Sequence, residues 1–401
     1  MRVAVVHNII APYRIPLFNL LSNSPGIDLT VLFMAQTERD RQWQIDRLRA
    51  DIHFRYDVLR GAHIPWRETT VHLNPGLLFR LVRLHPDVIL VTSLSAATAV
   101  CLAYGLLMRV PVVVWWAGTA QTEQQTGTVK RAWRSLLIPL VGAFLCYSDA
   151  AAAFLLGLGV PRGKLFVAGN VTFDALEYHR LVEQAHPQAA AWRESRGLSS
   201  SLVILSIGRL IALKNMEGVL QVFAAIRRRV RRASLAIVGE GHLLSSLETL
   251  AAKLGLADVL FEGAVQPGEL PMYYGAADLF IHLSFRDRWS QVVSEAMAAG
   301  LPVIVSIADQ ASDLIADGRS GLVVDPAGID GVASRAAALL TASPDARRAM
   351  GDAAFLQVAE RDVSHTLRVL LACLAAAARA YRPAVKPPPK PLADHAPSDR
   401  P

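Results

Sequence analysis

The sequence has 401 residues, of which 52% are hydrophobic and 19% are charged. This length and apolar content exclude a short peptide module and a wholly disordered chain, and they predict two or three globular domains. The 41 basic and 34 acidic residues give a net charge of +7, which suits phosphate-bearing ligands or an anionic membrane but is too small to indicate a nucleic-acid partner.

Apolar, β-rich runs alternate with helix-length segments through the first half of the chain. The runs are 3–6, 29–33, 88–91, 110–115 and 143–147. This alternation is typical of parallel strands joined by crossover helices. We therefore expect an N-terminal, acceptor-side Rossmann-like domain over 1–175. Its first loop presents Arg14, which we expect either to contact a phosphate or to anchor the loop.

The stretch 88–108 is uncharged and is long enough to cross a bilayer. Polar residues such as Thr92 and Ser95 interrupt it, so a strand at 88–91, a loop and a helix at 96–108 are the better interpretation. The start of the chain lacks the pattern of a secretory signal, and the three cysteines lie far apart. We expect a cytoplasmic protein.

A second series of apolar runs follows, at 203–206, 234–238, 259–262, 279–282, 302–306 and 321–324. The expected fold is thus α/β, with two doubly wound Rossmann-like domains facing a central cleft. The second domain is predicted at 201–360 after a linker at 176–200, and helices at 361–382 precede a disordered, proline-rich tail at 383–401. The cleft is the expected ligand site.

Two segments of the second domain carry the candidate chemistry. After its first strand, SIGRLIALKN turns at Gly208 and presents Arg209 and Lys214, two cations suited to a diphosphate. Further on, FRDRWSQVVSEAMAAGLPVIVS predicts a loop and then a helix that begins near Ser290. This segment offers the first-turn amides of Ser290, Gln291 and Val292 to an anion, and the carboxylates of Asp287 and Glu295 to sugar hydroxyls. His282, on a predicted strand, is interpreted as a core or wall histidine.

These segments, in this order, resemble the retaining glycosyltransferases of the GT-B fold, in particular family four. EAMAAGLPVIVS, FEGAVQPGELPMYYGAADLFIHLS and DGRSGLVV carry the resemblance, which is dense over 201–326 and thinner before it.

The resemblance implies transfer of a sugar from a nucleotide-diphosphate sugar, with retained anomeric configuration and without a metal or other cofactor. By the same resemblance, Arg209 and Lys214 bind the phosphates, Glu295 holds the ribose, Asp287 orients the sugar, and the backbone near Val265 contacts the base. The acceptor class implied is a glycan or lipid-linked saccharide in polysaccharide biosynthesis.

Two alternatives stay open. The aspartate at 287, the serine at 290 and Ala117 depart from the family's usual residues, and glycine is usual near Gln310. These departures motivate a non-catalytic GT-B binding subunit. The other alternative is a nucleotide-sugar epimerase.

Two basic segments are candidates for contact with an anionic membrane. Residues 226–232, IRRRVRR, are best explained as a solvated helix end. Residues 129–140 mix cations with a tryptophan and leucines, which suits either a solvated helix or peripheral contact at the inner face of the plasma membrane.

Overall fold

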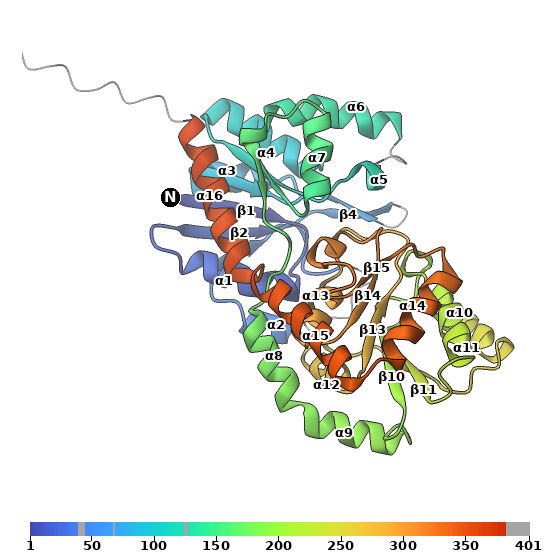
Figure 1. The fold of residues 1–401 in the computed structure, drawn as a ribbon. Coiled ribbons are helices and arrows are strands. Elements are labelled where there is room, and N and C mark those ends of the chain that lie inside the picture. The colour runs from blue at the N-terminus through green and yellow to red at the C-terminus, as the bar shows by residue number, and fades with distance from the viewer. Residues whose placement is uncertain (39–44, 67–68, 124–126, 382–401) are drawn as a thin grey trace, which may run out of the picture.

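A computed structural model describes residues 1–38, 45–66, 69–123 and 127–381 of the chain. Its main elements are two parallel sheets, each covered by helices on both faces (Figure 1). The predicted α/β architecture of two Rossmann-like units is confirmed. The predicted tail at 383–401 lies outside the described residues.

The first sheet has the strand order β3-β2-β1-β6-β7-β8-β9. Its strands are β1 (Arg2–His7), β2 (Asp28–Phe33), β3 (Arg55–Val58), β6 (Val88–Val91), β7 (Val112–Trp116), β8 (Ala143–Cys146) and β9 (Leu165–Val167). The central strands are apolar runs because both of their faces are buried, and they match the predicted runs. The strand, loop and helix predicted across 88–108 are confirmed as β6 and a helix, α4 (Ala96–Met108).

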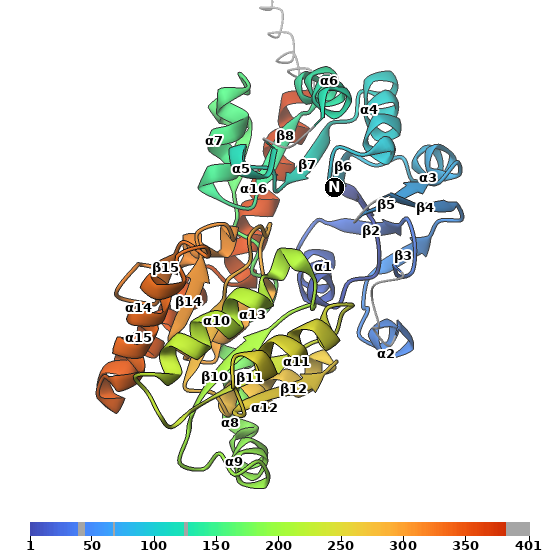
Figure 2. The same ribbon diagram turned by 90° about the vertical axis from the view of Figure 1, so that its right-hand side faces the viewer.

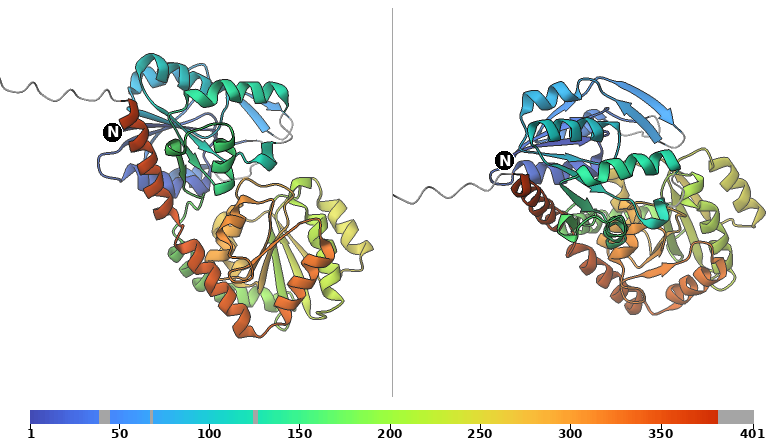
Figure 3. Two further views of the ribbon diagram at one scale, coloured as in Figure 1. Left: turned by 45° about the horizontal axis from the view of Figure 1, so that its top comes forward. Right: turned by 90° about the horizontal axis from the view of Figure 1, so that it is seen from above.

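Helices cover both faces of this sheet. The helices before α16 are α1 (Ile15–Ser22), α2 (Ile45–Ala50), α3 (Leu77–Leu84), α4, α5 (Ala120–Glu123), α6 (Thr128–Leu137) and α7 (Asp149–Gly157). One apolar core joins the sheet to α3, α4, α6 and α7, and the other joins it to α1 and the last described helix, α16 (Val363–Tyr381). Figure 3 shows these layers from two further sides.

Three features of the first half were not predicted. The edge strand β3 reads Arg-Tyr-Asp-Val, and the opposite edge strand β9 has three residues, so neither forms an apolar run. The third is an antiparallel hairpin of β4 (Ala62–Trp66) and β5 (Thr69–Leu73). Edge strands bury less surface than central strands, so their sequences carry a weaker signal.

The second sheet has the order β12-β11-β10-β13-β14-β15. Its strands are β10 (Leu202–Ile207), β11 (Ala233–Val238), β12 (Val259–Gly263), β13 (Leu279–His282), β14 (Val303–Ser306) and β15 (Leu322–Val324). Its helices are α10 (Met216–Arg227), α11 (Leu244–Lys253), α12 (Leu270–Gly275), α13 (Gln291–Ala298), α14 (Ile329–Thr341) and α15 (Pro344–Ala359). β10 occupies the position that β1 has in the first sheet, with neighbours on both sides.

The segment predicted as a linker contains two helices, α8 (Ala175–Gln184) and α9 (His186–Ser195). Both contact α12, and α8 also contacts α13 and α15. The side chains of Ala175 and Val182 belong to the core on that face of the second sheet. These helices therefore belong structurally to the second half of the molecule.

The chain returns to the first half at its C-terminal end. α16 runs along the first sheet (Figure 1) and contacts β6, β7, β8 and β9. By length and hydropathy, Pro344–Tyr381 is the one candidate membrane-crossing stretch among the described residues. Because α16 buries Leu370, Cys373 and Leu374 against the first sheet, the fold itself accounts for this apolar composition.

Candidate functional site

The loop after β10 carries the first pair of candidate residues. Gly208 donates its amide to Val238 O at 3.0 Å, and Arg209 follows, half-buried. The loop closes in a short 3₁₀ helix, Ala212–Lys214, and Asn215 adopts a left-handed conformation with φ of 52°. The Asn215 side chain accepts from Gly218 N at 3.1 Å and donates to Leu283 O at 3.1 Å. Asn215 therefore caps α10 and ties this loop to the end of β13.

The second candidate segment is the loop from β13 into α13. The helix start predicted near Ser290 is confirmed: Ser290 is the N-cap residue and Gln291 is the first helical residue. Phe285 N donates to Leu213 O at 2.9 Å, which joins this loop to the Lys214 loop although the two are distant in sequence. The first turn of α13 therefore lies beside the loop after β10.

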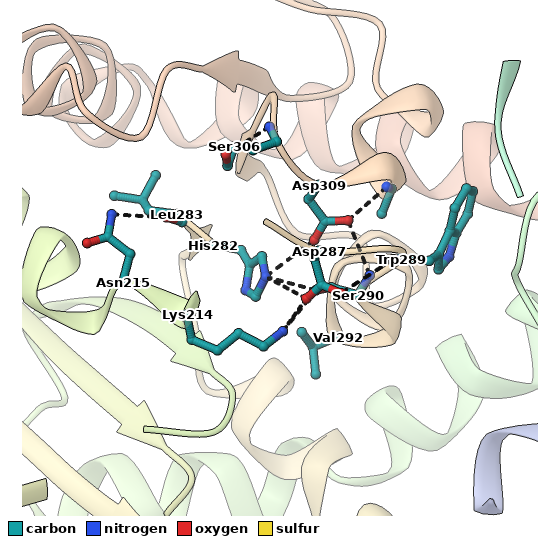
Figure 4. A network of polar contacts seen from close by, with 12 residues as sticks. Lys214, Asn215, His282, Leu283, Asp287, Trp289, Ser290, Val292, Ser306 and Asp309 are labelled. Carbon is teal, nitrogen blue, oxygen red and sulfur yellow. Dashed lines mark hydrogen bonds and ion pairs between the residues drawn. The ribbon is translucent and has the colours of Figure 1, made fainter. Parts of the chain in front are cut away.

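Asp287, Lys214 and Ser290 form a compact polar network (Figure 4). The Lys214 ammonium forms an ion pair with Asp287 Oδ2 and lies 3.3 Å from Ser290 Oγ. Ser290 Oγ donates to Asp287 Oδ2 at 2.6 Å. Lys214 has three N–H donors, so two contacts within the protein leave one for a ligand.

Two residues without a predicted role complete this network. Asp309 follows β14, and its Oδ1 accepts from Ser290 N at 3.2 Å and from Ala311 N at 2.9 Å. His282 ends β13, and its Nε2 lies 2.8 Å from Ser290 Oγ and 3.3 Å from Asp309 Oδ2. Since the Ser290 hydroxyl gives its proton to Asp287, His282 Nε2 is the donor in the contact with Ser290.

The network shifts the pKa values of two of its members, Asp287 and His282. Burial opposes ionisation of Asp287, but the Lys214 ammonium and the neighbouring His282 outweigh it and hold the pKa of this carboxyl well below its usual range. Burial likewise opposes protonation of His282, but hydrogen bonding to Asp287 and Asp309 prevails and raises its pKa. The site thus holds an ionised Asp287 paired with Lys214, beside an imidazole whose pKa is raised.

Glu295 lies one turn further along α13 in a different environment. Tyr274 donates its hydroxyl to Glu295 Oε2 at 2.9 Å, and Tyr178 lies next to Tyr274 with 6.2 Å between ring centroids. Burial raises the pKa of Glu295 to about 7, and the Tyr274 hydrogen bond opposes this shift. Burial and Glu295 together raise the pKa of Tyr178 well above its usual range. Glu295 is therefore a carboxyl group that changes charge near neutral pH.

Loops at the carboxyl ends of both sheets contact each other. Gln310 follows β14; its Nε2 donates to Ala117 O at 2.7 Å, and its Oε1 accepts from Ser148 Oγ at 2.6 Å. Gln291 Nε2 donates to Asn170 O at 2.8 Å. The first turn of α13 therefore lies directly at the junction of the two halves.

Arg14 also lies at this junction, but it is buried. Its guanidinium donates to Asn170 Oδ1 at 2.7 Å and to Tyr147 Oη at 2.5 Å. It lies over the Trp115 ring at 3.9 Å from the centroid, within the range of a cation–π contact. These contacts favour the loop-anchoring interpretation of Arg14 over phosphate binding.

The predicted residues thus separate into two groups. Lys214, Asp287 and Ser290 contact one another, and Gln291 and Val292 extend from them along the first turn of α13. The remaining predicted residues make none of the contacts described above for this network. They are Gly208 and Arg209 in the β10 loop, Glu295 beside Tyr274, Arg14 at the junction, and Val265, a partly buried residue after β12 that packs against the apolar core.

His282 and Asp309 are the residues that the sequence analysis missed, since it interpreted His282 as a wall histidine and did not consider Asp309. Both lie at or just beyond the carboxyl end of a predicted strand, β13 and β14 respectively. Ligand-facing residues gather at this edge of a parallel sheet. That position was the signal available in the sequence.

His282, Asp287 and Asp309 are close enough to share a metal ion, because one ligand atom from each lies within 4.8 Å of the others. The Lys214 ammonium already pairs with Asp287 at this place, however, and Asp309 Oδ1 accepts from two backbone amides. A second cation would be repelled by Lys214. The residues present therefore fit a metal poorly.

Comparison with known proteins finds similarity over the second half of the chain. Residues 189–357 match the model of the family described as glycosyl transferases group 1. A GDP-mannose-dependent alpha-(1-6)-phosphatidylinositol monomannoside mannosyltransferase of Mycolicibacterium smegmatis is 34% identical over 171 residues, which are 40% of this chain and 44% of that protein. The sulfoquinovosyl transferase SQD2 of Arabidopsis thaliana is 24% identical over 279 residues, 67% of this chain and 52% of that one. The alignments thus span about half the length of these curated relatives.

Solved structures extend the similarity to the whole fold. Anabaena Alr3699/HepE, solved in complex with UDP, has a TM-score of 0.76 at 18% identity, over 94% of this chain and 100% of that one. The same protein has been solved with UDP-glucose, with a TM-score of 0.75. The chain therefore has the GT-B fold, and its residues 189–357 match the glycosyl transferases group 1 family.

Proposed function

We propose that this protein is a glycosyltransferase, which moves a sugar from a nucleotide-diphosphate sugar, such as a UDP- or GDP-sugar, to a hydroxyl group. The observation that carries the proposal is the convergence of Lys214, Asp287 and the first turn of α13 at the junction of the two halves. A cation, a helix N-terminus and an ionised carboxylate are the groups that a diphosphate and a sugar require. The match of residues 189–357 to the family supports it independently.

The diphosphate would bind at Lys214 and at the N-terminus of α13. Asp309 already takes the Ser290 amide, so we assign the phosphate oxygens to the amides of Gln291 and Val292 and to the remaining donor of Lys214. Arg209, in the same loop as Lys214, would add a planar fork of donors. Negative charge grows on the diphosphate as the glycosidic bond breaks, and these fixed donors stabilise that charge more in the transition state than in the ground state.

The sugar and the ribose would be held by the two carboxylates. Asp287 Oδ2 is bonded to Lys214 and Ser290, whereas Oδ1 makes a long contact of 3.4 Å with Trp289 N, so Oδ1 is the oxygen proposed for a sugar hydroxyl. Glu295 would accept from the ribose through Oε1, since Oε2 is bonded to Tyr274. The base would contact the backbone near Val265.

Retention of anomeric configuration and independence from metal are part of the proposal. Asp287 is unsuited to act as a general base, because its lowered pKa makes it a weak proton acceptor. No protein group is assigned that role. The Lys214 ammonium takes the charge-neutralising place that a divalent cation has in other sites.

The proposed acceptor is a glycan or lipid-linked saccharide in cytoplasmic polysaccharide biosynthesis. The M. smegmatis relative is named for a phosphatidylinositol monomannoside, an acceptor that carries lipid. The acceptor would enter from the first half, whose loops after β7 and β8 meet Gln310.

The test is a panel of UDP- and GDP-sugars, with release of the nucleoside diphosphate as the activity measurement and thermal shift as the binding measurement. One sugar nucleotide should raise the unfolding temperature and, with a saccharide acceptor, release its diphosphate. Lys214→Ala should lower turnover about 100-fold or more, whereas Lys253→Ala, at an exposed lysine of α11, should leave it unchanged.

Three outcomes would contradict the proposal. Binding without release across the panel and a set of saccharide acceptors would favour a non-catalytic GT-B subunit. Conversion of the sugar on an intact nucleotide would favour an epimerase. Full activity of Lys214→Ala would show that the site is wrongly assigned.

A further inference from the structure

Helix α6 buries Leu137 in the core but turns three other large apolar side chains toward solvent. Val129, Trp133 and Leu136 recur at helical spacing, and they are 84%, 38% and 65% exposed. On the opposite side of the helix, Arg134 points inward, pairs with Glu123 and lies 5.2 Å from the centroid of the Trp116 ring. A surface helix normally has the reverse arrangement, with its apolar stripe against the core.

Two neighbouring helices expose further large apolar side chains. α3 presents Phe79, which is 67% exposed, with Leu78 and Val82 beside it, and the end of α4 presents Leu107, which is 81% exposed. α3 contacts α4, and α6, α4 and α3 follow one another across the same side of the first half (Figure 2). We call the exposed side of α3, α4 and α6 the apolar face.

The three helices of this face carry basic residues but no acidic ones. From 77 to 84, 96 to 109 and 128 to 137 the sequence has six Arg or Lys and no Asp or Glu. Arg80 pairs with Asp57 and Arg134 pairs with Glu123, both partners lying outside the three helices. The exposed residues Arg83, Arg109 and Arg131 are spread over all three.

Arg109 occupies a position that disfavours a side chain. It ends α4 in the left-handed region, with φ of 55°, where glycine is usual. The side chain held in this strained conformation is an exposed cation at the edge of the apolar face. A ligand for that cation would account for the choice of residue.

From these observations we infer that the apolar face docks on a bilayer that contains anionic lipids. Apolar side chains would enter the boundary between headgroups and acyl chains, while the arginines would meet the anionic headgroups. Charge complementarity selects this occupant, because three helices that carry exposed apolar and basic side chains and no acidic residue of their own match a bilayer that is apolar inside and anionic at its surface. The other basic segment lacks this combination, since Arg227 pairs with Asp258 and Arg229 donates to Ser334.

The inference does not depend on the proposed function, so it is tested without any sugar nucleotide. The full-length protein is sedimented with vesicles of phosphatidylcholine alone or of equimolar phosphatidylcholine and phosphatidylglycerol. We expect strong binding only to the second kind, and weaker binding as salt is added.

One variant removes an apolar side chain from each helix: Phe79→Ser, Leu107→Ser and Leu136→Ser combined. Its partition onto the anionic vesicles should fall at least about tenfold. The matched control combines Leu176→Ser, Leu181→Ser and Leu356→Ser, three exposed leucines on helices of the second half, and should bind as the unaltered protein does. A third variant, Arg83→Gln, Arg109→Gln and Arg131→Gln, should lose about tenfold in binding and most of its salt dependence.

Trp133 offers a direct measure of insertion. Lipids brominated on their acyl chains should quench part of the tryptophan fluorescence, and Trp133→Phe should remove the quenched part. The inference is overturned if the protein does not bind anionic vesicles, or if the control variant loses as much binding as the first. It is also overturned if the first variant binds normally but changes a dimer into a monomer in solution, because the face would then join two copies of the chain.

Discussion

The loops after β1 and β10 occupy corresponding places in two sheets of similar order, and each carries a cation. Arg14 meets an aromatic ring, an amide oxygen and a phenol, and it is buried at the junction. Lys214 meets a carboxylate and a hydroxyl, and it keeps one donor for a ligand. The fold supplies the position of the cation, and the neighbouring side chains decide how many of its donors are used within the protein.

The largest expected effect comes from removing Lys214, the cation of the second half. Lys214→Ala leaves the Asp287 carboxylate partly buried without its ion-pair partner, which should lower the free energy of unfolding by about 3 kcal/mol. Adding Asp287→Asn should restore more than half of this loss. Urea unfolding of the two single variants and the double variant measures the coupling, and a loss below about 1 kcal/mol would show that the pair is solvated.

The pH dependence of stability tests the second half of the molecule, where Glu295 lies. Its pKa rises from 4.5 to about 7 on folding, so the folded protein keeps a proton that the unfolded chain releases in this interval. The free energy of unfolding should therefore fall as the pH rises through this window, by at most about 3 kcal/mol from this group.

Glu295→Gln cannot release the proton and should lack this decline. Its stability relative to the unaltered protein should increase between about pH 5 and about pH 8. Denaturant unfolding across this range measures the difference. Parallel curves for the two proteins would show that Glu295 has an ordinary pKa.

Arg14→Met tests the other side of the comparison. Loss of the Trp115 stacking and of the hydrogen bonds to Asn170 and Tyr147 should reduce the free energy of unfolding by about 2 kcal/mol. Binding of the sugar nucleotide should change by less than about threefold, since the guanidinium is committed to protein groups. The control is Arg180→Met, at an exposed arginine of α8. A tenfold or greater loss of affinity for the sugar nucleotide would instead support Arg14 as a phosphate ligand.

The smallest effect concerns the contact between the halves. Gln310→Ala removes the hydrogen bonds to Ala117 and Ser148 and should reduce stability by about 1 kcal/mol. Gln121→Ala, at an exposed glutamine of α5, is the control and should have no effect. Equal melting temperatures for both variants would mean that water replaces the Gln310 contacts without loss.

The sequence predicts the central strands and the loops at their ends, because a strand buried on both faces must be an apolar run. It does not predict β3 or β9, whose edge positions allow polar or very short sequences. The periodicity of α6 shows an apolar stripe but not that most of it faces solvent while Arg134 points inward to Glu123. Likewise, the sequence identifies Lys214 and Asp287 as candidate site residues, but it does not predict that they form an ion pair.

The course of α16 bears on how the two halves move. Two stretches of chain cross between the halves, one near Val171 and one just before Val363, and they bond to each other: Thr366 Oγ1 donates to Val171 O at 2.7 Å and Val363 N to Phe173 O at 3.1 Å. A double tether of this kind favours rotation about the line through both crossings over sliding or separation. Opening and closing on a substrate would then follow a single hinge, and truncation before α16 would both free the hinge and expose the apolar side chains that α16 covers.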